Sequence, residues 1–256
     1  MTSVPPAGIE LLRGQDWLYA GVTTRESETA FLEGVAAGPI RAIAAARQVH
    51  GAGVVQVTGP PRTVPAEPAR LPGDAIDRPA SARGAGAPEG WRFGAADALM
   101  TSHPGVMIAV SVADCLPVIL ADPQHRAVGV AHAGWRGLAA GVISSLAASM
   151  SRAFGSRAAV LLAGMGPSIG PCCYEVGDDV VAVMRAAGRD AVFTSRGARP
   201  RLDLAATAER ELTRLGVRAA SIERLDECTA CRPERFFSRR RDGAILGRMW
   251  GFAVVR

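Results

Sequence analysis

The stretches that decide the fold are SVADCLPVIL at residues 111–120 and VGVAHAGWRG at residues 128–137. Each contains a compact apolar run of strand length, and the turn-forming residues DPQH at 122–125 stand between them. We therefore expect two adjacent buried strands. Cys115 and His132 fall at the ends of these strands, beside Gly-rich turns, in a chain with only four histidines and five cysteines. The pair marks a candidate site.

Outward from this core, apolar periodicity predicts strands and helices that alternate without strict βαβ regularity and without repeats. This pattern is typical of an α+β (mixed α/β) chain, a single domain over residues 1–256 with mixed β-sheets flanked by helices. The expected strands are 16–23, 53–58, 106–112, 118–121, 127–131, 159–166, 217–225 and 245–255. Four helices are expected. The first spans 39–47, and the second has Leu138, Val142, Leu146 and Met150 on one face. The third is capped by Asp178 or Asp179 and reaches Ala187, and the fourth is capped by Asp203 and ends at Gly216.

The segment at about 59–90 interrupts this pattern. It is rich in Pro, Ala, Gly and Arg and has almost no hydrophobic periodicity, which is the composition of a flexible surface loop. Because the apolar pattern resumes directly afterwards, we interpret the segment as a flexible loop insertion within the single domain.

Composition and charge exclude several classes of protein. The net charge of +5 comes from arginines in a chain without lysine, and no recognised binding motif accompanies it, so we expect no nucleic-acid partner. No apolar run approaches the roughly 20 residues of a membrane helix, and the N-terminus lacks a signal-peptide pattern. An odd number of cysteines, two of them adjacent, argues against a disulfide framework. We expect a cytoplasmic protein with free thiols and no membrane partner.

A third residue joins the candidate site. His50 lies in RQVHGAGVV, between a predicted helix and a predicted strand. The positions of His50, Cys115 and His132 fit no local zinc-finger spacing, but three ligands that converge from three loops are typical of a catalytic metal site, which leaves a fourth position for water or substrate. A zinc ion there would lower the pKa of its water toward about 7 and polarise a substrate oxygen.

The residues also allow other interpretations. Cys115 as a thiolate nucleophile with His132 as its base is one alternative. Another alternative is that each histidine is an ordinary half-buried residue and that Cys115 is a small side chain of the core. Both the metal-site interpretation and the nucleophile interpretation require Cys115 and His132 to meet in space.

Six blocks of sequence carry a family resemblance. They are QVHG at 48–51, ADALMT at 96–101, ADCLPV at 113–118, HAGWRG at 132–137, GPSIGPCCYEV at 166–176 and FFSRRRDG at 236–243. In this order they resemble the laccase-domain, YfiH-like family, whose members are named purine nucleoside phosphorylases and, in older usage, polyphenol oxidases. The family pattern usually carries an aromatic residue where this chain has Arg239.

The resemblance implies a YfiH-like fold and a zinc ion held by His50, Cys115 and His132, which are also the implied catalytic residues. It implies phosphorolysis of adenosine, inosine, guanosine or methylthioadenosine to a base and a pentose 1-phosphate, together with deamination of adenosine. The expected partners are purine nucleosides and phosphate, with the chain a monomer or weak homodimer. The alternatives are a Cys/His hydrolase that edits peptidoglycan precursors, a copper-dependent polyphenol oxidase and a non-catalytic metal-binding protein.

The histidine count argues against a multicopper centre. Copper sites draw mainly on imidazole and thiolate ligands, and His103 and His125 are both expected at the surface. A single copper ion in the predicted three-ligand site stays an alternative to zinc, because two histidines and one cysteine also describe an electron-transfer copper centre.

Substrate-binding residues are predicted in two groups. Arginine can donate bidentate hydrogen bonds to phosphate, although an ordinary solvated role is the alternative. The Gly-rich loop around Ser168 can present backbone N–H groups to an anion. The predicted substrate contacts are Arg47, Arg136, Ser168, Arg240 and Arg241, and the acidic residues expected to orient ligands are Asp97 and Asp114.

The remaining cysteines are expected to have no role. Cys228 and Cys231 have CxxC spacing, but no second CxxC exists. The adjacent Cys172 and Cys173 look poorly shaped to complete a four-cysteine site, so Cys231 is interpreted as incidental and the pair as redox-inactive.

Overall fold

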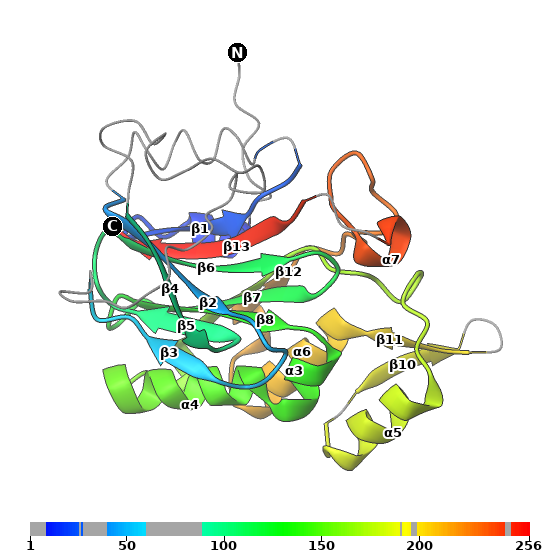
Figure 1. The fold of residues 1–256 in the computed structure, drawn as a ribbon. Helices are drawn as coiled ribbons and strands as arrows, with labels where there is room; N and C mark the ends of the chain where they lie inside the picture. The colour runs from blue at the N-terminus through cyan, green and yellow to red at the C-terminus, as the bar shows by residue number, and fades with distance from the viewer. Residues whose placement is uncertain are drawn as a thin grey trace.

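The computed structural model describes residues 9–25, 27, 40–59, 89–189, 191–195, 199–243 and 247–256. These residues form three layers: two stacked β-sheets, and helices that cover the outer face of the second sheet (Figure 1). Within the described residues, no helix is both long enough and apolar enough to cross a membrane.

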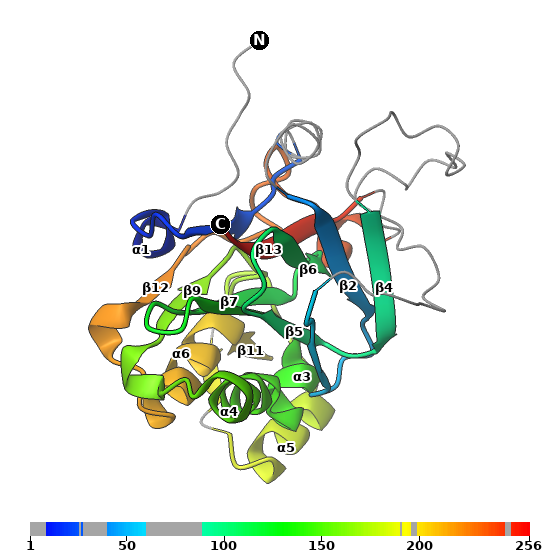
Figure 2. The same ribbon diagram turned by 90° about the vertical axis from the view of Figure 1, so that its left-hand side faces the viewer.

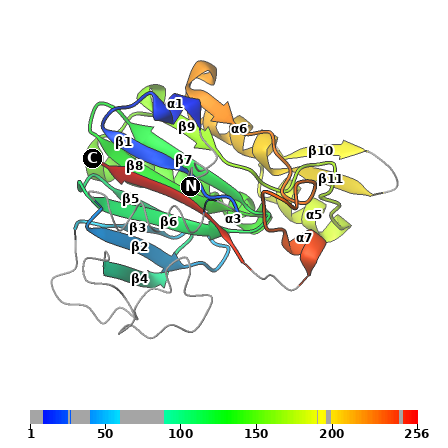
Figure 3. The same ribbon diagram turned by 90° about the horizontal axis from the view of Figure 1, so that it is seen from above.

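The first sheet joins the two ends of the described chain. Its strand order is β1-β13-β6-β2-β4, antiparallel from β1 to β6 and parallel from β6 to β4. Figure 3 shows β1 beside β13 in the view from above. The strands are β1 (Leu18–Val22), β13 (Met249–Val255), β6 (Val106–Val112), β2 (Ala42–Arg47) and β4 (Glu89–Ala95).

The second sheet contains the pair of strands around which the candidate site was predicted. Its order is β12-β9-β7-β8-β5-β3, with the two outermost pairs parallel and the inner pairs antiparallel. β7 and β8 are adjacent, as expected, and Pro117 of β7 lies opposite His132 of β8. The strands are β12 (Ile222–Arg224), β9 (Leu162–Met165), β7 (Leu116–Asp122), β8 (Ala127–Ala133), β5 (Ala98–Thr101) and β3 (Val54–Gln56).

Alternating side chains of β7 supply two separate cores. Ile119 and Ala121 pack into the core between the sheets, whereas Val118 and Leu120 pack into the core between the second sheet and the helices. A strand buried on both faces reads as a continuous apolar run, which is why the sequence marked it. Figure 2 shows the covering helices beneath the second sheet; they are α3 (Trp135–Ala140), α4 (Val142–Phe154) and α6 (Leu204–Arg214).

Several smaller elements gather at one end of the molecule, on the right in Figures 1 and 3. They are the helices α5 (Asp178–Ala186) and α7 (Arg239–Asp242) and the two-stranded sheet of β10 (Val192–Ser195) and β11 (Pro200–Asp203). Helix α1 (Glu10–Arg13) packs instead on β9 and β12. Of the residues predicted for the site, Ser168 lies in the loop before α5, and Arg240 and Arg241 lie in α7.

The predicted mixed fold is confirmed, but one predicted helix is wrong. Residues 42–47 of the expected helix at 39–47 form strand β2, because their alanines are buried between β6 and β4 and sheet packing outweighs the helix propensity of alanine. The insertion predicted at about 59–90 lies mostly outside the described residues, and its last two residues, Glu89 and Gly90, belong to β4.

Four further boundaries differ from expectation. The single helix expected after Gly137 divides at Gly141, whose φ of +81° separates α3 from α4. The strands expected at 159–166 and 217–225 each begin with a 3-10 turn, Ala158–Val160 and Ala219–Ser221. Asp178 and Asp179 lie in the first turn of α5 but do not cap it, since Gly177 is the N-cap residue. The predicted cap of α6 is confirmed, because the Asp203 carboxylate accepts a hydrogen bond from the Ala206 N–H at 2.9 Å.

Candidate metal centre

The three predicted ligands meet in space. His50 lies in the turn between β2 and β3, Cys115 directly precedes β7, and His132 lies in β8. One ligand atom from each falls within 4.8 Å of the others, and the two imidazole rings stand edge to face with centroids 4.8 Å apart. His132 is buried, Cys115 is half-buried and His50 is exposed. This set, which we call the metal centre, is therefore open to solvent on the His50 side.

A glycine allows the three side chains to come this close. Gly134 follows β8, and a Cβ atom added to it would lie 2.8 Å from the Cys115 Sγ and 3.6 Å from the His50 ring. Any larger residue would displace the thiol, so the glycine of the HAGWRG block is required for the metal centre to form.

Asp97 holds two of the three ligands from behind. Its buried carboxylate accepts hydrogen bonds from the His132 Nδ1 at 2.9 Å and from the N–H groups of Val49, His50 and Gly51 at 3.1, 2.9 and 2.7 Å. The bonds to the loop support the positive φ of +61° at His50. The bond to His132 leaves its Nε2 for a ligand, which is the usual arrangement of a histidine that binds metal.

The two histidines make Cys115 an unusually acidic thiol. Burial raises its pKa, but hydrogen bonds from His132 and His50 and their charges lower the pKa to about 7. Burial lowers the pKa of His132, but bonds to Asp97 and Cys115 raise it to about 9. Burial raises the pKa of Asp97, yet its four hydrogen bonds bring it below the usual value. A thiolate is thus available near neutral pH, as a metal ligand requires.

The donor set fits one metal ion. Two imidazoles and a thiolate with an open fourth direction suit a zinc ion, and also a single copper ion. The other two histidines lie elsewhere: the His103 ring is 3.2 Å from the Pro104 carbonyl oxygen, and the His125 ring is 2.8 Å from the Asp122 carboxylate. Among the described residues, neither joins a group of potential metal ligands, so a multicopper centre does not fit.

Asp114 supports Cys115 from the other side. Its backbone has a φ of +87°, which is strained for a residue with a side chain. The carboxylate accepts hydrogen bonds from the Thr229 hydroxyl at 2.6 Å and from the Arg240 N–H at 2.7 Å, and the Asp114 carbonyl accepts one from the Ile169 N–H at 2.9 Å. Three distant segments therefore fix the residue next to the thiol.

Two of the predicted arginines surround a tyrosine that the sequence analysis missed. Burial and the charge of Cys115 raise the pKa of Tyr174 to about 12, while the charges of Arg240 and Arg136 act to lower it. The Arg240 guanidinium lies 5.1 Å from the centre of the Tyr174 ring, and that of Arg136 lies 4.4 Å from the Trp135 ring. The Tyr174 phenol therefore interacts electrostatically with the Cys115 thiol and with two arginines. Its only sequence signal is its place in the block at 166–176.

The other predicted substrate contacts are placed differently. The Arg241 guanidinium donates to the carbonyls of Thr229 and Phe236, both at 2.9 Å, and to the carboxylate of Asp242. Ser168 is buried, and Arg47 is exposed at the end of β2, three residues before His50. The structure therefore engages the Arg241 guanidinium with its own loop, whereas the Arg240 guanidinium lies against the Tyr174 ring and donates to the Glu175 carbonyl at 2.9 Å.

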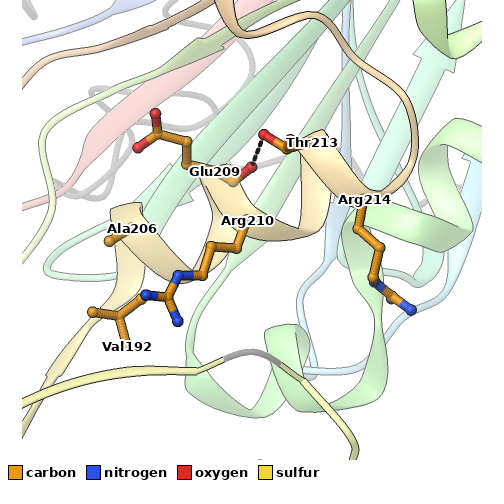
Figure 4. Close-up of a pocket in the computed structure, with 6 residues that line it drawn as sticks. All are labelled: Val192, Ala206, Glu209, Arg210, Thr213 and Arg214. Carbon is orange, nitrogen blue, oxygen red and sulfur yellow. Dashed lines mark hydrogen bonds between the residues drawn. The ribbon is translucent and has the colours of Figure 1, made fainter.

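Two surface hollows lie apart from these residues. One runs along α6 and is drawn in Figure 4; the other lies between β3 and α4. The ligands of the metal centre line neither of these two hollows. The first is lined by Val192, Ala206, Glu209, Arg210, Thr213 and Arg214, and the second by Ala52, Val54, Ser144, Ser145, Ala148, Ser149 and Arg152.

The expectation that Cys172 and Cys173 are poorly shaped to complete a four-cysteine site is wrong. The sulfur atoms of the four remaining cysteines converge within 4.8 Å of one another, and we call this group the four-cysteine cluster. Adjacent residues point to opposite faces of a strand, but Cys172 and Cys173 lie in a turn that directs both thiols to one side. The members of the cluster are Cys172, Cys173, Cys228 and Cys231.

The chain is similar to several known proteins. The model of a family described as multi-copper polyphenol oxidoreductase laccase matches residues 24–256. A purine nucleoside phosphorylase of Xylella fastidiosa (strain 9a5c) is 43% identical over 150 residues, which are 57% of this chain and 56% of that protein. Adenosine deaminase RL5, from an unknown prokaryotic organism, is 38% identical over 156 residues, 59% of each chain.

The match thus spans less than two thirds of each relative's own length. Among solved structures, YlmD from Geobacillus stearothermophilus has a TM-score of 0.76 and 26% identity, and the superposition covers 98% of this chain and 95% of that one. This likeness confirms the predicted family fold.

Proposed function

The chain belongs to the family described as multi-copper polyphenol oxidoreductase laccase, and from this membership we propose that it is a zinc-dependent purine nucleoside phosphorylase that also deaminates adenosine. Relatives named for these two activities support the proposal. The observation that carries it is the convergence of His50, Cys115 and His132 with one side left open. The proposed substrates are adenosine, inosine, guanosine and methylthioadenosine, each with phosphate.

The three ligands would hold the zinc ion, and Asp97 would keep the His132 Nε2 directed toward it. When bound, the ion supplies Lewis-acid chemistry, which polarises an oxygen atom and lowers the pKa of water. Deamination needs this chemistry, because an oxygen from water replaces the amino group at C6 of adenine and ammonia leaves. Cys115 is a ligand in this proposal and does not attack substrate.

Phosphorolysis places different demands on the chain. The C1′–N9 bond of the nucleoside breaks, and a phosphate oxygen bonds to C1′. Among the predicted arginines, Arg136 and Arg240 are the two whose charges act on Tyr174, and we assign them to the phosphate. The Tyr174 phenol keeps its proton at neutral pH, so it donates a hydrogen bond to the substrate. Contacts from Arg47, Ser168 and Arg241 stay predictions.

A purified protein tests the proposal directly. Adenosine incubated with phosphate is expected to yield adenine and ribose 1-phosphate, and without phosphate a slower release of inosine and ammonia. His132→Ala is expected to lose both activities. His103→Ala is the matched control, since that exposed histidine lies outside the metal centre and its loss leaves the activities unchanged. Unchanged adenosine in both incubations, with zinc bound, overturns the proposal.

A second candidate function rests on the acidity of Cys115. Its pKa of about 7 and its contacts with two histidines are also what a thiol nucleophile requires, as in a hydrolase of peptidoglycan precursors. Chelation separates the two functions, because a Cys115–His132 dyad keeps its activity without metal and the zinc enzyme loses it. Metal analysis of the purified protein distinguishes zinc from copper.

A further inference from the structure

The four-cysteine cluster joins two loops that are far apart in sequence. Cys172 and Cys173 lie between β9 and α5, and Cys228 and Cys231 lie between β12 and α7. The Cys231 sulfur is 3.6 Å from that of Cys172 and 3.3 Å from that of Cys173. Zinc–sulfur bonds of about 2.3 Å place the sulfurs of a tetrahedral site about 3.8 Å apart. The spacing therefore suits a shared metal ion, whereas a disulfide needs about 2 Å.

Backbone pairing holds the two loops together independently of any ion. The Ser168 N–H donates to the Glu227 carbonyl at 3.3 Å, and the Thr229 N–H donates to the Ser168 carbonyl at 3.0 Å. These bonds form a short parallel bridge between Ser168 and Cys228. Because the bridge includes Cys228 itself and lies shortly before Cys172 in the other loop, the sulfur positions are largely preformed.

One of the thiols already receives a hydrogen bond from the backbone. The Gly170 N–H donates to the Cys228 sulfur at 3.2 Å, an interaction that favours a thiolate over a thiol. A Cβ atom at Gly170 would lie 3.3 Å from the Cys172 sulfur and 3.3 Å from the Cys228 Cβ. The glycine therefore lets the first loop close over the sulfur atoms.

The number and type of ligands decide what the cluster can hold. Four thiolates complete a tetrahedron and leave no position for water, which is the composition of a structural zinc site. Soft thiolates select zinc or iron among the common metal ions. A four-iron cluster needs its cysteine sulfurs farther apart, since the iron–sulfur cube lies between them.

Both loops also contact the residue behind the metal centre. Thr229, between the cysteines of the second loop, donates its hydroxyl to the Asp114 carboxylate, and Ile169 of the first loop donates its N–H to the Asp114 carbonyl. An ion bound by both loops would therefore fix the backbone that carries Cys115.

From these contacts we propose that the four-cysteine cluster binds a zinc ion as a structural site, separate from the metal centre. The ion joins the two loops and thereby stabilises the support of Cys115. This site does not depend on the proposed catalytic function, because its ligands, its geometry and its test involve no nucleoside.

Metal analysis of protein purified under reducing conditions tests the proposal. Wild type is expected to hold about two zinc ions per chain, one in each site. Cys231→Ser, which keeps the side-chain size, is expected to hold about one fewer, and so is Cys115→Ala. The double variant is expected to hold almost none. Circular dichroism verifies that each variant is folded.

Thiol alkylation of the wild type gives a second measurement that needs no variant. With zinc bound, the exposed Cys172 and Cys231 are expected to react slowly with a thiol reagent. A strong chelator is expected to remove the zinc and to make both thiols reactive. Three results overturn the proposal: about one zinc ion in both wild type and Cys231→Ser, iron in place of zinc, or disulfides among the four cysteines. Immediate alkylation of Cys172 and Cys231 in zinc-loaded protein also overturns it.

Discussion

The metal centre draws three ligands from three separate elements, whereas the four-cysteine cluster draws four from two loops. Three ligands leave one position of a tetrahedron open, and four ligands fill it. The metal centre lies at the ends of buried strands, while the cluster lies on loops that support one of its ligands. The number of ligands and the supporting elements thus distinguish the catalytic role that we propose for the first group from the structural role that we propose for the second.

The neighbours of each thiol reinforce this difference. Histidines lower the pKa of Cys115 to about 7, against the effect of burial. Burial raises the pKa of Cys172, and the sulfurs of Cys228 and Cys231 raise it further, to about 11. Imidazoles supply positive charge to a thiolate, and other thiols do not. Without a cation, therefore, the metal centre favours a thiolate and Cys172 keeps its proton at neutral pH.

The largest expected effect separates the two sites by activity. Cys115→Ala is expected to lower phosphate-dependent adenine release by at least about a thousandfold, because the Lewis acid is worth several kcal/mol to the reaction. Cys231→Ser is expected to lower it less than about tenfold, since the ligands of the metal centre are retained. The ratio of kcat/KM values measures the contrast. Equal losses in the two variants would remove the distinction between a catalytic and a structural site.

The next effect concerns the support of the metal centre. Asp97→Asn keeps the volume of the buried side chain but weakens its bonds to His132 and to the His50 loop. We expect zinc affinity at the metal centre to fall about 10- to 100-fold, as measured by competition with a chelator. Asp122→Asn is the matched control, since Asp122 is also buried and bonded to a histidine, but away from the metal centre. A similar loss of affinity in both variants would contradict the role of Asp97.

A smaller effect is expected on stability when the four-cysteine cluster loses its ion. Cys231→Ser is expected to lower the melting temperature by roughly 5–10 °C, because loss of a structural ion costs a few kcal/mol of unfolding free energy. A strong chelator is expected to lower the wild-type melting temperature similarly and to have little further effect on a variant that lacks both sites. Thermal unfolding by circular dichroism measures these shifts. An unchanged melting temperature in Cys231→Ser would contradict a stabilising ion.

The smallest effect tests the link between the two sites. Thr229→Val removes the hydroxyl that donates to buried Asp114 and is expected to cost about 1–3 kcal/mol of stability. Thr213→Val is the control, because that exposed hydroxyl donates to the Glu209 carbonyl of its own helix, as Figure 4 shows, and its loss is expected to stay within about 0.5 kcal/mol. Urea denaturation measures both. Equal values would show that the Thr229 bond contributes nothing specific.

The sequence allowed the central strands, and the meeting of Cys115 and His132 at their ends, to be anticipated for physical reasons. Strands buried on both faces are continuous apolar runs, so β7 and β8 were predictable, and with them the meeting of Cys115 and His132. Strand β2 was predicted as a helix because its alanines favour helices locally, and only their burial between neighbouring strands reverses that preference.

The surroundings of the site were harder to predict. Tyr174 reaches the metal centre from an irregular loop, and hydrophobic periodicity carries no information about such loops. The convergence of the cysteines depends on a turn at Cys172 and Cys173 and on pairing with a loop more than 50 residues away. Neither a turn direction nor a long-range contact follows from Cys spacing alone.

A zinc titration of metal-free Cys231→Ser protein gives the most direct test, because the metal centre is then the one intact site. Phosphate-dependent adenine release is expected to be absent without metal, to rise in proportion to the zinc bound, and to reach a plateau at about one ion per chain. Full activity in the metal-free protein, or no activity with the ion bound and the protein folded, would contradict catalysis at His50, Cys115 and His132.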